Sequence, residues 1–380
     1  MLIIRSAFRN RLRTLLTAVG VALAIVAFLF LRTFIAAWYA GVDASATDRL
    51  IVRNKISITF SLPKSYVEKV RNVPGVADVT WGNWFGGVYI DEKNFFAQFA
   101  VDGESYYRLY PEFLLAPEEY KAFMGDRKGC VVGELLAEKY GFKIGDRITL
   151  NGAIYPGQWE FTVRGIYKGR DKATDRQQMH FHWKYLDDSL AEARRDQIGT
   201  IMLKVAASSP EVAQTIDKMF VNSLAETRTE SEKAFQLSFV SMASAVIDAI
   251  QIVSIVVLVI LMLILGNTLA MATRERTTEY AAMRALGFQP FHIVLLVLGE
   301  GFVMSLTGAT LAVALATPIL KLFAQLFERN LGNFLGGFDL DPKLVLMAVG
   351  IALAGGMLAA AIPAWRAGRL KIVDALRRIE

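Results

Sequence analysis

The composition of this chain of 380 residues excludes an ordinary soluble protein, because 54% of the residues are hydrophobic and they are concentrated at the two ends. The formal net charge of +6 does not indicate nucleic-acid binding, since the arginines cluster beside the apolar segments and no basic run with interleaved aromatic residues occurs. The single cysteine, Cys130, excludes an intrachain disulfide and a cysteine-based metal cluster.

The first 38 residues predict a membrane anchor that is not cleaved. Residues 1–13 contain four arginines and are expected to form a short cytoplasmic helix, and residues 14–38 are expected to be the first membrane span. A secretory signal peptide also begins with basic residues, but its apolar region is only about 7–15 residues long. The apolar stretch here is longer and reaches the roughly 20 residues that a bilayer core requires.

Residues 41–240 have the composition of a soluble domain, and their pattern predicts a mixed α/β fold. Short apolar runs bounded by Gly and Pro predict strands at 56–60, 76–80, 95–101, 147–150, 159–167 and 200–205. Helices are predicted at 65–71, 117–123, 134–140 and 210–220, the last with Ser209 as its N-cap. Residues 226–235 are polar and compatible with a helix, so the second span could begin as a stalk outside the membrane.

Three further apolar stretches predict membrane spans at 245–272, 291–322 and 344–365. The last contains Gly350, Gly355 and Gly356, which predicts close helix packing in place of lipid exposure. The expected fold class is therefore membrane α-helical, with four transmembrane helices and a mixed α/β extracytoplasmic domain inserted between the first and the second.

Arginines and lysines in the connecting segments predict the orientation, because cytoplasmic loops carry an excess of them. They are frequent in residues 1–13, in the segment 273–290 and in the tail 366–380, whereas the loop 323–342 has Arg329 as its one unambiguous positive charge. Both termini and the segment 273–290 are therefore expected in the cytoplasm. The domain is expected on the outer side of the membrane, whose lipid the spans contact.

No catalytic site is predicted. The sequence has no G-x-S-x-G, H-E-x-x-H or phosphate-binding G-x-x-x-x-G-K-[ST] motif, so no cofactor is expected on this chain and, if ATP drives the protein, the nucleotide is expected on a partner chain. His180 and His182 would share one face of a strand, but no carboxylate stands at a spacing typical of a metal site, and a solvated or loop-supporting pair is favoured. The aromatic stretch 81–96 could line a binding surface, although core packing is favoured.

Glu300 lies inside the third span, where a carboxylate is costly enough to indicate a function. The favoured alternative is that it faces the helix bundle, is paired with a hydroxyl or a backbone group, and helps the helices to associate. No metal site is expected there.

The segment 273–290 is the most informative part of the sequence. Its charges at helical spacing and a stop formed by Gly287 and Pro290 predict a short amphipathic helix. The residues then available to dock on another protein are Ala281, Ala282, Met283, Ala285 and Leu286. The alternative is a helix that lies on the membrane surface.

The same segment, TRERTTEYAAMRALGF, resembles the signature of the FtsX/MacB-type ABC permease family. In that family an Arg-x-x-Glu and an Arg-Ala-x-Gly follow the second membrane helix, and the matching residues here are Arg276, Glu279, Arg284, Ala285 and Gly287. The similarity continues with Glu300 and Gly308 in the next span and with PAWRAGRLKIVDALR near the C-terminus. VPGVADV and VVGELLAEKYGFKIGDRITL are similar to the MacB-type periplasmic core domain.

Two features depart from the family pattern. Tyr280 and Ala281 stand where the family often has Ile-Gly, and no ATPase domain precedes the first span, which indicates a separately encoded ATPase. The resemblance implies a transporter permease of a bacterial inner membrane and not an enzyme. It also implies a dimer with a second copy or a paralogue, and ABC ATPase subunits that dock on residues 277–287 and move the outer domains.

Two functions remain open at this point. The leading hypothesis is export of a hydrophobic or amphipathic substrate, as in efflux or lipid or lipoprotein transport, with a periplasmic adaptor and an outer-membrane channel as further candidate partners. The alternative is ATP-driven transmembrane signalling that controls a cell-wall hydrolase or senses a ligand. A membrane-anchored enzyme is disfavoured, because the catalytic motifs are absent.

Overall fold

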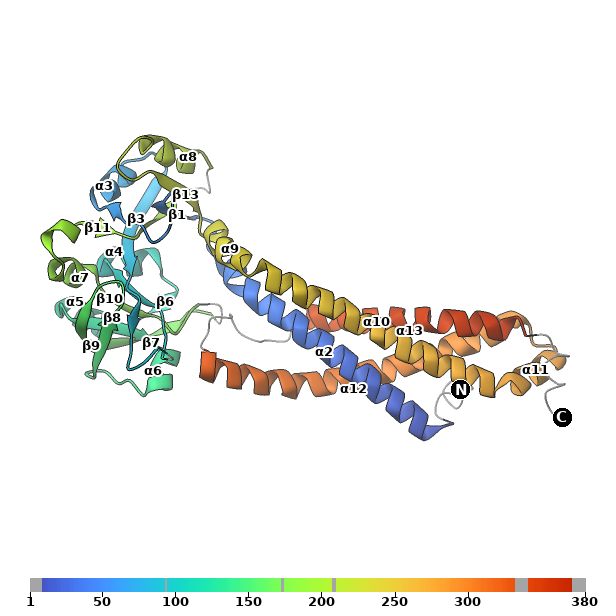
Figure 1. Cartoon of the computed structure of the whole chain (residues 1–380). Coiled ribbons are helices and arrows are strands. Elements are labelled where there is room, and N and C mark those ends of the chain that lie inside the picture. Colours follow the sequence, from blue (N-terminus) through green and yellow to red (C-terminus); the bar gives the residue numbers. More distant parts are fainter. Residues whose placement is uncertain (1–8, 93, 172–173, 207–209, 332–340, 371–380) are drawn as a thin grey trace. The chain divides into compact units, whose positions relative to one another are not determined.

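The apolar segments of the chain form long helices in the computed structural model, which describes residues 9–370 except 93, 172–173, 207–209 and 332–340. Among these residues, four helices are long and apolar enough to span a membrane. They are α2 (Arg11–Ala44), α10 (Ser244–Glu275), α12 (Pro290–Leu331) and α13 (Pro342–Gly368) (Figure 1). The predicted N-terminal helix 1–13, the tail 366–380 and the N-cap Ser209 lie partly or wholly outside the described residues.

Contacts along the chain divide it into two units, which are described separately. The helical unit comprises Met1–Ala37, Ala243–Gln325 and Phe338–Glu380, and the mixed unit comprises Trp38–Met242 and Leu326–Gly337. Helix α2 runs without a break from one unit into the other, whereas α9 (Glu232–Met242) and α10 are separated at Ala243. Helix α12 continues to Leu331, so the first part of the predicted loop 323–342 is helical.

Small residues bring the helices of the helical unit close together. A Cβ added at Gly356 of α13 would lie 1.7 Å from Ser305 Oγ of α12, and one at Gly301 of α12 would lie 2.8 Å from Ala360 Cβ. In a membrane, where apolar burial gives little driving force, such close contacts hold helices together. The predicted packing role holds for Gly356. It is wrong for Gly350, because a Cβ added there would have no atom within 4 Å.

A mixed sheet forms the centre of the other unit (Figure 1). Its strand order is β13-β1-β12-β3-β5-β10-β7-β9-β8-β4 with β6 paired to β9, and β11 pairs with β2 separately. The pairs β10–β5 and β7–β9 are parallel, and their neighbours are antiparallel.

The described strands are β1 (Arg49–Asn54), β2 (Leu62–Pro63), β3 (Val76–Trp84), β4 (Gly87–Val88), β5 (Gln98–Val101), β6 (Phe113–Leu114), β7 (Gly129–Gly133), β8 (Arg147–Gly152), β9 (Gly157–Gly169), β10 (Met179–His182), β11 (Gln197–Ile198), β12 (Thr200–Val205) and β13 (Thr227–Ser231). The helices that accompany them are α3 (Ser65–Arg71), α4 (Gly103–Leu109), α5 (Pro117–Gly125), α6 (Glu134–Tyr140), α7 (Trp183–Ser189) and α8 (Pro210–Met219).

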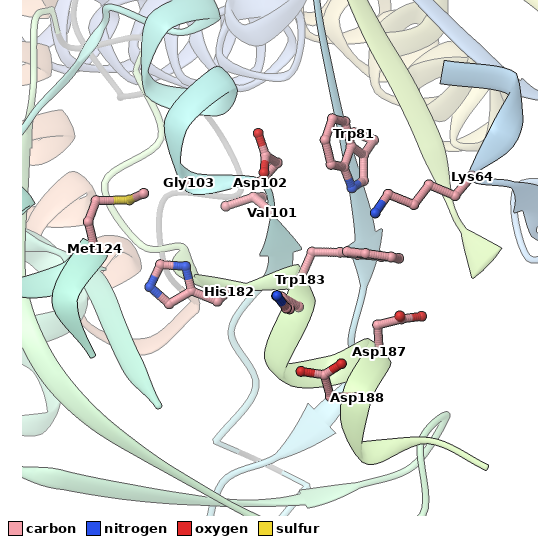
Figure 2. A pocket seen from close by; sticks show the side chains of 11 residues that line it. Lys64, Trp81, Val101, Asp102, Gly103, Met124, His182, Trp183, Asp187 and Asp188 are labelled. Atoms are coloured by element: carbon pink, nitrogen blue, oxygen red, sulfur yellow. The ribbon is translucent and has the colours of Figure 1, made fainter. Parts of the chain in front are cut away.

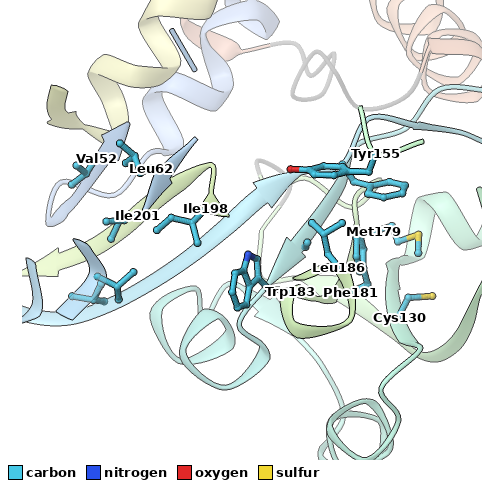
Figure 3. Packing of buried hydrophobic residues seen from close by; sticks show 14 of the residues in the cluster. Val52, Leu62, Cys130, Tyr155, Met179, Phe181, Trp183, Leu186, Ile198 and Ile201 are labelled. Atoms are coloured by element: carbon cyan, nitrogen blue, oxygen red, sulfur yellow. The ribbon is translucent and has the colours of Figure 1, made fainter. Parts of the chain in front are cut away.

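Alternation of apolar and polar residues builds the core of this unit. In β9 the buried Trp159, Phe161 and Val163 alternate with more exposed residues, as expected for a strand with one face toward a core. The same core includes residues of β1, β7, β10 and α7 (Figure 3). Cys130 of β7 lies there with no exposed surface, and burial raises the pKa of its thiol.

Residues 56–60 do not form the predicted strand. The chain turns instead, because Asn54 Oδ1 accepts a hydrogen bond from Ile56 N at 3.0 Å and Ser57 Oγ accepts one from Thr59 N at 3.3 Å. Such bonds from side chain to backbone compete with strand pairing. Ile56 is consequently 82% exposed.

The helix predicted for residues 226–235 is also wrong in its first half, which is β13. This strand pairs antiparallel with β1, almost the whole domain away in sequence. On its other side the Asp217 carboxylate accepts a hydrogen bond from Thr229 N at 3.0 Å, so the free edge is partly closed to a further strand. The helix α9 begins only at Glu232.

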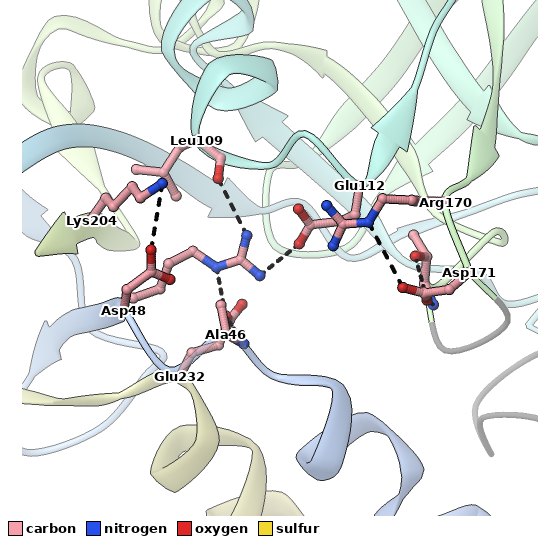
Figure 4. Close-up of polar contacts among 10 residues, drawn as sticks. Ala46, Asp48, Leu109, Glu112, Arg170, Asp171, Lys204 and Glu232 are labelled. Carbon is pink, nitrogen blue, oxygen red and sulfur yellow. Dashed lines mark hydrogen bonds and ion pairs between the residues drawn. The ribbon is translucent and has the colours of Figure 1, made fainter. Parts of the chain in front are cut away.

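Arg49 joins the points where the chain enters and leaves this unit. It lies at the start of β1, and its Nε is 2.7 Å from Glu232 Oε2, at the start of α9. Its Nη2 is 2.6 Å from Glu112 Oε1, and Figure 4 shows Glu112 and Glu232 at this cluster. The guanidinium carbon of Arg49 lies 4.3 Å from the centre of the Tyr110 ring. Burial raises the pKa of the Glu232 carboxyl despite the adjacent guanidinium.

We expect Arg49→Met to lower the free energy of unfolding by about 3–5 kcal/mol, because it leaves two largely buried carboxylates without their cation. Chemical unfolding of the detergent-solubilised protein measures this loss. The control Arg71→Met removes an exposed ion pair with Glu68, and we expect it to cost about 0–1 kcal/mol. Equal losses in the two variants would refute a structural role for the Arg49 cluster.

Candidate functional site

A short helix, α11 (Thr277–Ala285), follows α10 and ends at a glycine. Gly287 has a φ of +96°, in the left-handed region that favours glycine. Its N–H donates to Arg284 O at 3.1 Å, and Phe288 N–H donates to Met283 O at 3.1 Å. These two bonds satisfy carbonyls that a helix end leaves free, so α11 stops where the sequence predicts.

Arg276, at the junction of α10 and α11, makes an ion pair with Glu300 of α12. Glu300 is 1% exposed, so its side chain lies inside the helical unit. A buried carboxylate needs a charged or hydrogen-bonding partner to be tolerated. The guanidinium that the structure provides was not anticipated from the sequence, which favoured a hydroxyl or backbone partner.

Two ion pairs connect the beginning of α2 with the end of α10 and with α11. Arg9 Nη1 lies 2.5 Å from Glu279 Oε1, and Arg13 Nη2 lies 2.6 Å from Glu275 Oε1. Arg9 lies just before α2 and Arg13 in its first turn, whereas Glu275 ends α10 and Glu279 lies in α11. The earlier arginine pairs with the later glutamate, and the later arginine with the earlier glutamate. The segments therefore run antiparallel and hold each other in register.

Arg284 connects α11 to the end of α13. Its Nη1 donates to Gly368 O at 3.2 Å and to Leu370 O at 3.3 Å. These carbonyls belong to the last turn of α13 and the residues after it, where backbone acceptors lack intrahelical partners. Arg276, Glu279 and Arg284 thus connect α11 with α12, α2 and α13 respectively.

Tyr280 fixes the inner face of α11. It is 2% exposed and packs with Ile293 and Val297 of α12 and with Ala364 and Ala367 of α13. Burial raises the pKa of Tyr280 to about 12. The departure from the family pattern at this position is therefore accommodated by the apolar surroundings of the ring.

Apolar side chains are exposed from the last residue of α11, through the turn that follows it, to the start of α12; this stretch is the apolar end of α11. Leu286 is 80%, Phe288 46% and Phe291 64% exposed, and Ala285 is exposed beside them. Ala281, which the sequence analysis placed on a docking face, is buried. The two phenylalanines were missed because they follow the glycine stop, and no helical periodicity assigns them to a face.

Gly308 of α12 marks the crossing with α2. A Cβ added there would lie 2.4 Å from Val21 Cγ1 and 3.3 Å from Ala18 O. The backbones of the two helices therefore approach more closely than a side chain would allow. This contact places Gly308 in the packing of the helical unit, apart from α11.

His180 and His182 of β10 are structural. His180 is fully buried, with Nδ1 3.2 Å from the Tyr107 hydroxyl and Nε2 3.1 Å from Gln178 Oε1. His182 Nε2 donates to Phe123 O at 2.8 Å. Within the described part of the chain no group of three or more His, Cys, Asp or Glu residues could hold a metal ion. The solvated alternative is wrong for His180, whose pKa burial lowers to about 3.

Two family profiles match the chain. Residues 251–372 match the family described as FtsX-like permease C-terminal. Residues 14–219, more than half of the chain, match the MacB-like periplasmic core domain. The chain belongs to the FtsX/MacB-type family of ABC transporter permeases. Membership of this family implies an ATPase partner and identifies the chain as a transporter component.

Individual proteins similar to this permease cover nearly all of the chain or about half of it. An uncharacterized ABC transporter permease of Methanocaldococcus jannaschii is 23% identical over 403 positions, covering 99% of this chain and 97% of the relative. The periplasmic region of MacB from Actinobacillus actinomycetemcomitans is 10% identical with a TM-score of 0.38, covering 52% of this chain and 95% of that one. The extracellular domain of YknZ from Gram-positive bacteria is 11% identical with a TM-score of 0.34, covering 48% and 100%.

We expect Gly308→Ala to destabilise the permease by about 1–3 kcal/mol, because the added methyl group forces α2 and α12 apart. Thermal unfolding in detergent measures the effect. The control Gly350→Ala adds the same methyl group where nothing lies within 4 Å, and it should be neutral or slightly stabilising by helix propensity. Val21→Ala should restore part of the loss in the double variant; a Gly308→Ala protein as stable as Gly350→Ala contradicts the packing role.

We expect His180 to contribute to acid destabilisation. Its pKa is lower in the folded state than the 6.5 of a free imidazole, so its contribution is complete above pH 6.5 and falls as the pH decreases toward 3. Between pH 6.5 and pH 5 the loss is about 2 kcal/mol, at about 1.4 kcal/mol per pH unit. His180→Asn, although less stable overall, should lose this part of the pH dependence of the unfolding free energy; an unchanged acid slope contradicts the assignment.

Proposed function

We propose that this permease couples ATP hydrolysis by a separate ABC ATPase subunit to movement of its α/β domain, and that the ATPase docks on the apolar end of α11. The observation that carries the proposal is the exposure of Leu286, Phe288 and Phe291 beside a helix whose other side is buried. Exposed aromatic and aliphatic side chains gathered at one place are typical of protein interfaces.

The charged residues of the family signature have a positioning role in this proposal. Arg276, Glu279 and Arg284 bond to other helices of the permease, so they are not free to form the main contact with a partner. Through them a displacement of α11 acts on α12, α2 and α13 together. The same displacement of α11 acts on α10 through the backbone, because only Arg276 separates the two helices.

The stiffness of α2 supports transmission toward the outer domain. The helix has 34 residues without interruption, which corresponds to about 50 Å at 1.5 Å per residue. The chain leaves the α/β domain through α9 and α10, and Ala243 interrupts the helical conformation between them. Because α2 is continuous whereas α9 and α10 are separated at Ala243, a displacement at α11 would tilt the domain.

The remaining parts of the proposal follow from the sequence. The arginine-rich segments support an orientation with both termini and α11 in the cytoplasm and the α/β domain outside. In this proposal ATP binds to the partner, and the lack of a phosphate-binding loop motif in this sequence agrees with that. We propose a dimer of permeases that exports a hydrophobic or amphipathic substrate, with an adaptor and an outer-membrane channel as further partners.

The test is affinity purification of the tagged permease in mild detergent, followed by mass spectrometry and an ATPase assay. Leu286→Ser and Phe288→Ser should each reduce the recovered ATPase at least about tenfold, as expected for residues at the centre of an interface. The control Met242→Ser changes a side chain of similar exposure, 83% against 80%, outside α11 and should leave recovery unchanged.

The same samples distinguish between the candidate roles. A co-purified adaptor or outer-membrane channel supports export, whereas a cell-wall hydrolase or a sensor kinase supports the signalling alternative. If the Leu286→Ser and Phe288→Ser permeases are folded and each recovers as much ATPase as the parent protein, docking at this surface is refuted. A permease that repeatedly purifies without any ATPase refutes the coupling proposal as a whole.

A further inference from the structure

The α/β unit contains a cavity of about 300 Å³ whose lining carries charges of both signs (Figure 2). The charged residues of this lining are Lys64, Asp102, Lys184, Asp187 and Asp188. An anion and a cation would each meet repulsive side chains there, so the lining favours neither class of ligand. Core packing was favoured for the aromatic stretch 81–96. Phe85 and Phe96 do lie in the hydrophobic core, and Trp81 packs against it while also lining the cavity.

The helical unit, in contrast, holds a cation without a counter-ion. Arg32 belongs to α2 and lies inside Arg11–Tyr39, a segment long and apolar enough to span a membrane. Among the residues that the structure describes, Arg32 makes no ion pair, and its Nε is enclosed without a hydrogen-bond partner. Its two Nη atoms are not enclosed in this way, and the side chain is partly exposed. The charged end of Arg32 is therefore accessible.

The aromatic ring of Phe28 holds this guanidinium but does not neutralise it. The guanidinium carbon of Arg32 lies 5.6 Å from the centre of the ring, which is one turn earlier in α2. A ring face attracts a cation through its quadrupole and carries no net charge. A charged side chain inside a bilayer is costly unless an anion or hydrogen-bond acceptors accompany it. The counter-ion of Arg32 is therefore expected from outside the described part of the chain.

The position of Arg32 along α2 is close to a membrane surface. Arg13, which pairs with Glu275 near the start of α2, lies 19 residues earlier, or about 28 Å at 1.5 Å per residue. The hydrocarbon core of a bilayer is about 30 Å thick. Trp38 and Tyr39 follow within two turns of the helix, and their residue types are enriched where membrane meets water. The anion available at this depth is the phosphate of a lipid headgroup.

A carboxylate from a second copy of the permease is disfavoured as the counter-ion. The carboxylates of the four spans are Asp248, Glu275 and Glu300, and the last two already form ion pairs. Asp248 lies 27 residues before Glu275, or about 40 Å along α10, which is about 12 Å beyond the level of Arg32. A second copy related by an axis along the membrane normal keeps each residue at its own depth. Such a copy does not bring Asp248 to Arg32.

We propose that Arg32 binds the headgroup of an anionic phospholipid at the membrane surface opposite α11. The two Nη groups of a guanidinium can donate together to two phosphate oxygens. A headgroup with a net negative charge is favoured over a zwitterionic one, because the ammonium group of the latter competes with Arg32 for the same phosphate. The inference does not depend on the ATPase-coupling proposal, since lipid binding is measured on the permease alone.

The test is native mass spectrometry of the purified full-length permease with phosphatidylglycerol, phosphatidylcholine of the same acyl chains, and sn-glycerol 3-phosphate. The tightest lipid site should prefer phosphatidylglycerol at least about tenfold. Arg32→Gln should weaken phosphatidylglycerol binding there at least about tenfold and leave phosphatidylcholine binding unchanged. Arg32→Lys, which keeps the charge but not the planar donor pair, should retain part of the preference.

Thermal unfolding gives a second measurement on the same proteins. Phosphatidylglycerol should raise the Tm of the parent permease more than that of Arg32→Gln, because a ligand stabilises the folded state to which it binds. Without added lipid the two proteins should unfold alike, since Arg32 has no hydrogen bond or ion pair to lose within the described structure.

Two matched controls separate this site from general effects of sequence and charge. Thr33→Val removes a hydroxyl that follows Arg32 directly but is enclosed, in a residue that is 1% exposed. Lys321→Met removes an exposed cation of α12. Neither change should alter phosphatidylglycerol affinity by more than about twofold, because an exposed charge contributes little.

Equal affinity of the tightest site for the two lipids, or unchanged phosphatidylglycerol binding in Arg32→Gln, would overturn the proposal. Equal weakening by Lys321→Met would replace a specific site by general attraction to a positive surface. Displacement of the lipid by sn-glycerol 3-phosphate would make the ligand a free phosphate ester. A dimer that light scattering detects for the lipid-free parent but not for Arg32→Gln would assign the counter-ion to a second copy.

Discussion

A single buried guanidinium closes the α/β unit at the place where its helices join it. Arg49 follows α2, Glu232 begins α9, and Glu112 lies in the segment between α4 and β6. Because β1 and β13 are neighbouring antiparallel strands, the chain enters and leaves the sheet at adjacent positions. A domain inserted between two membrane spans requires this arrangement, since its ends must return to helices that cross the same bilayer. The ion cluster makes the junction resistant to separation, so that a pull on either helix acts on the sheet rather than on a loose linker.

The helical unit uses two kinds of contact for two tasks. Its interior is built from small residues, with Gly301, Gly308 and Gly356 at points where backbones nearly touch, and such contacts have no room for gradual adjustment. Its end is built from charged side chains that connect α11 to three of the spans. The interior therefore favours movement of the helices as rigid bodies, while the bonds of α11 determine which helices move together. Leu286, Phe288 and Phe291, which the proposed function assigns to the ATPase contact, stay exposed beside this end.

The sequence predicts those features that depend on neighbouring residues. The four spans follow from local composition, and the end of α11 follows from Gly287. The strands β1 and β13 define each other across the length of the domain, and nothing within 227–231 indicates that pairing. Similarly, the partner of Glu300 depends on how α12 packs beside the end of α10. Where a feature requires two distant segments, the sequence indicated residues such as Arg276 and Glu300 but not the contact between them.

The position of Cys130 has a practical consequence for studying movement in this protein. It is the sole cysteine of the chain, and it is sealed inside β7, where its thiolate form is disfavoured. Maleimides and spin-label reagents react with exposed thiolates, so the natural sequence already provides an unreactive background. A thiol introduced at any surface position would be the only one to be modified, and probes on α2 and on the sheet could report domain motion without first engineering the native residue away.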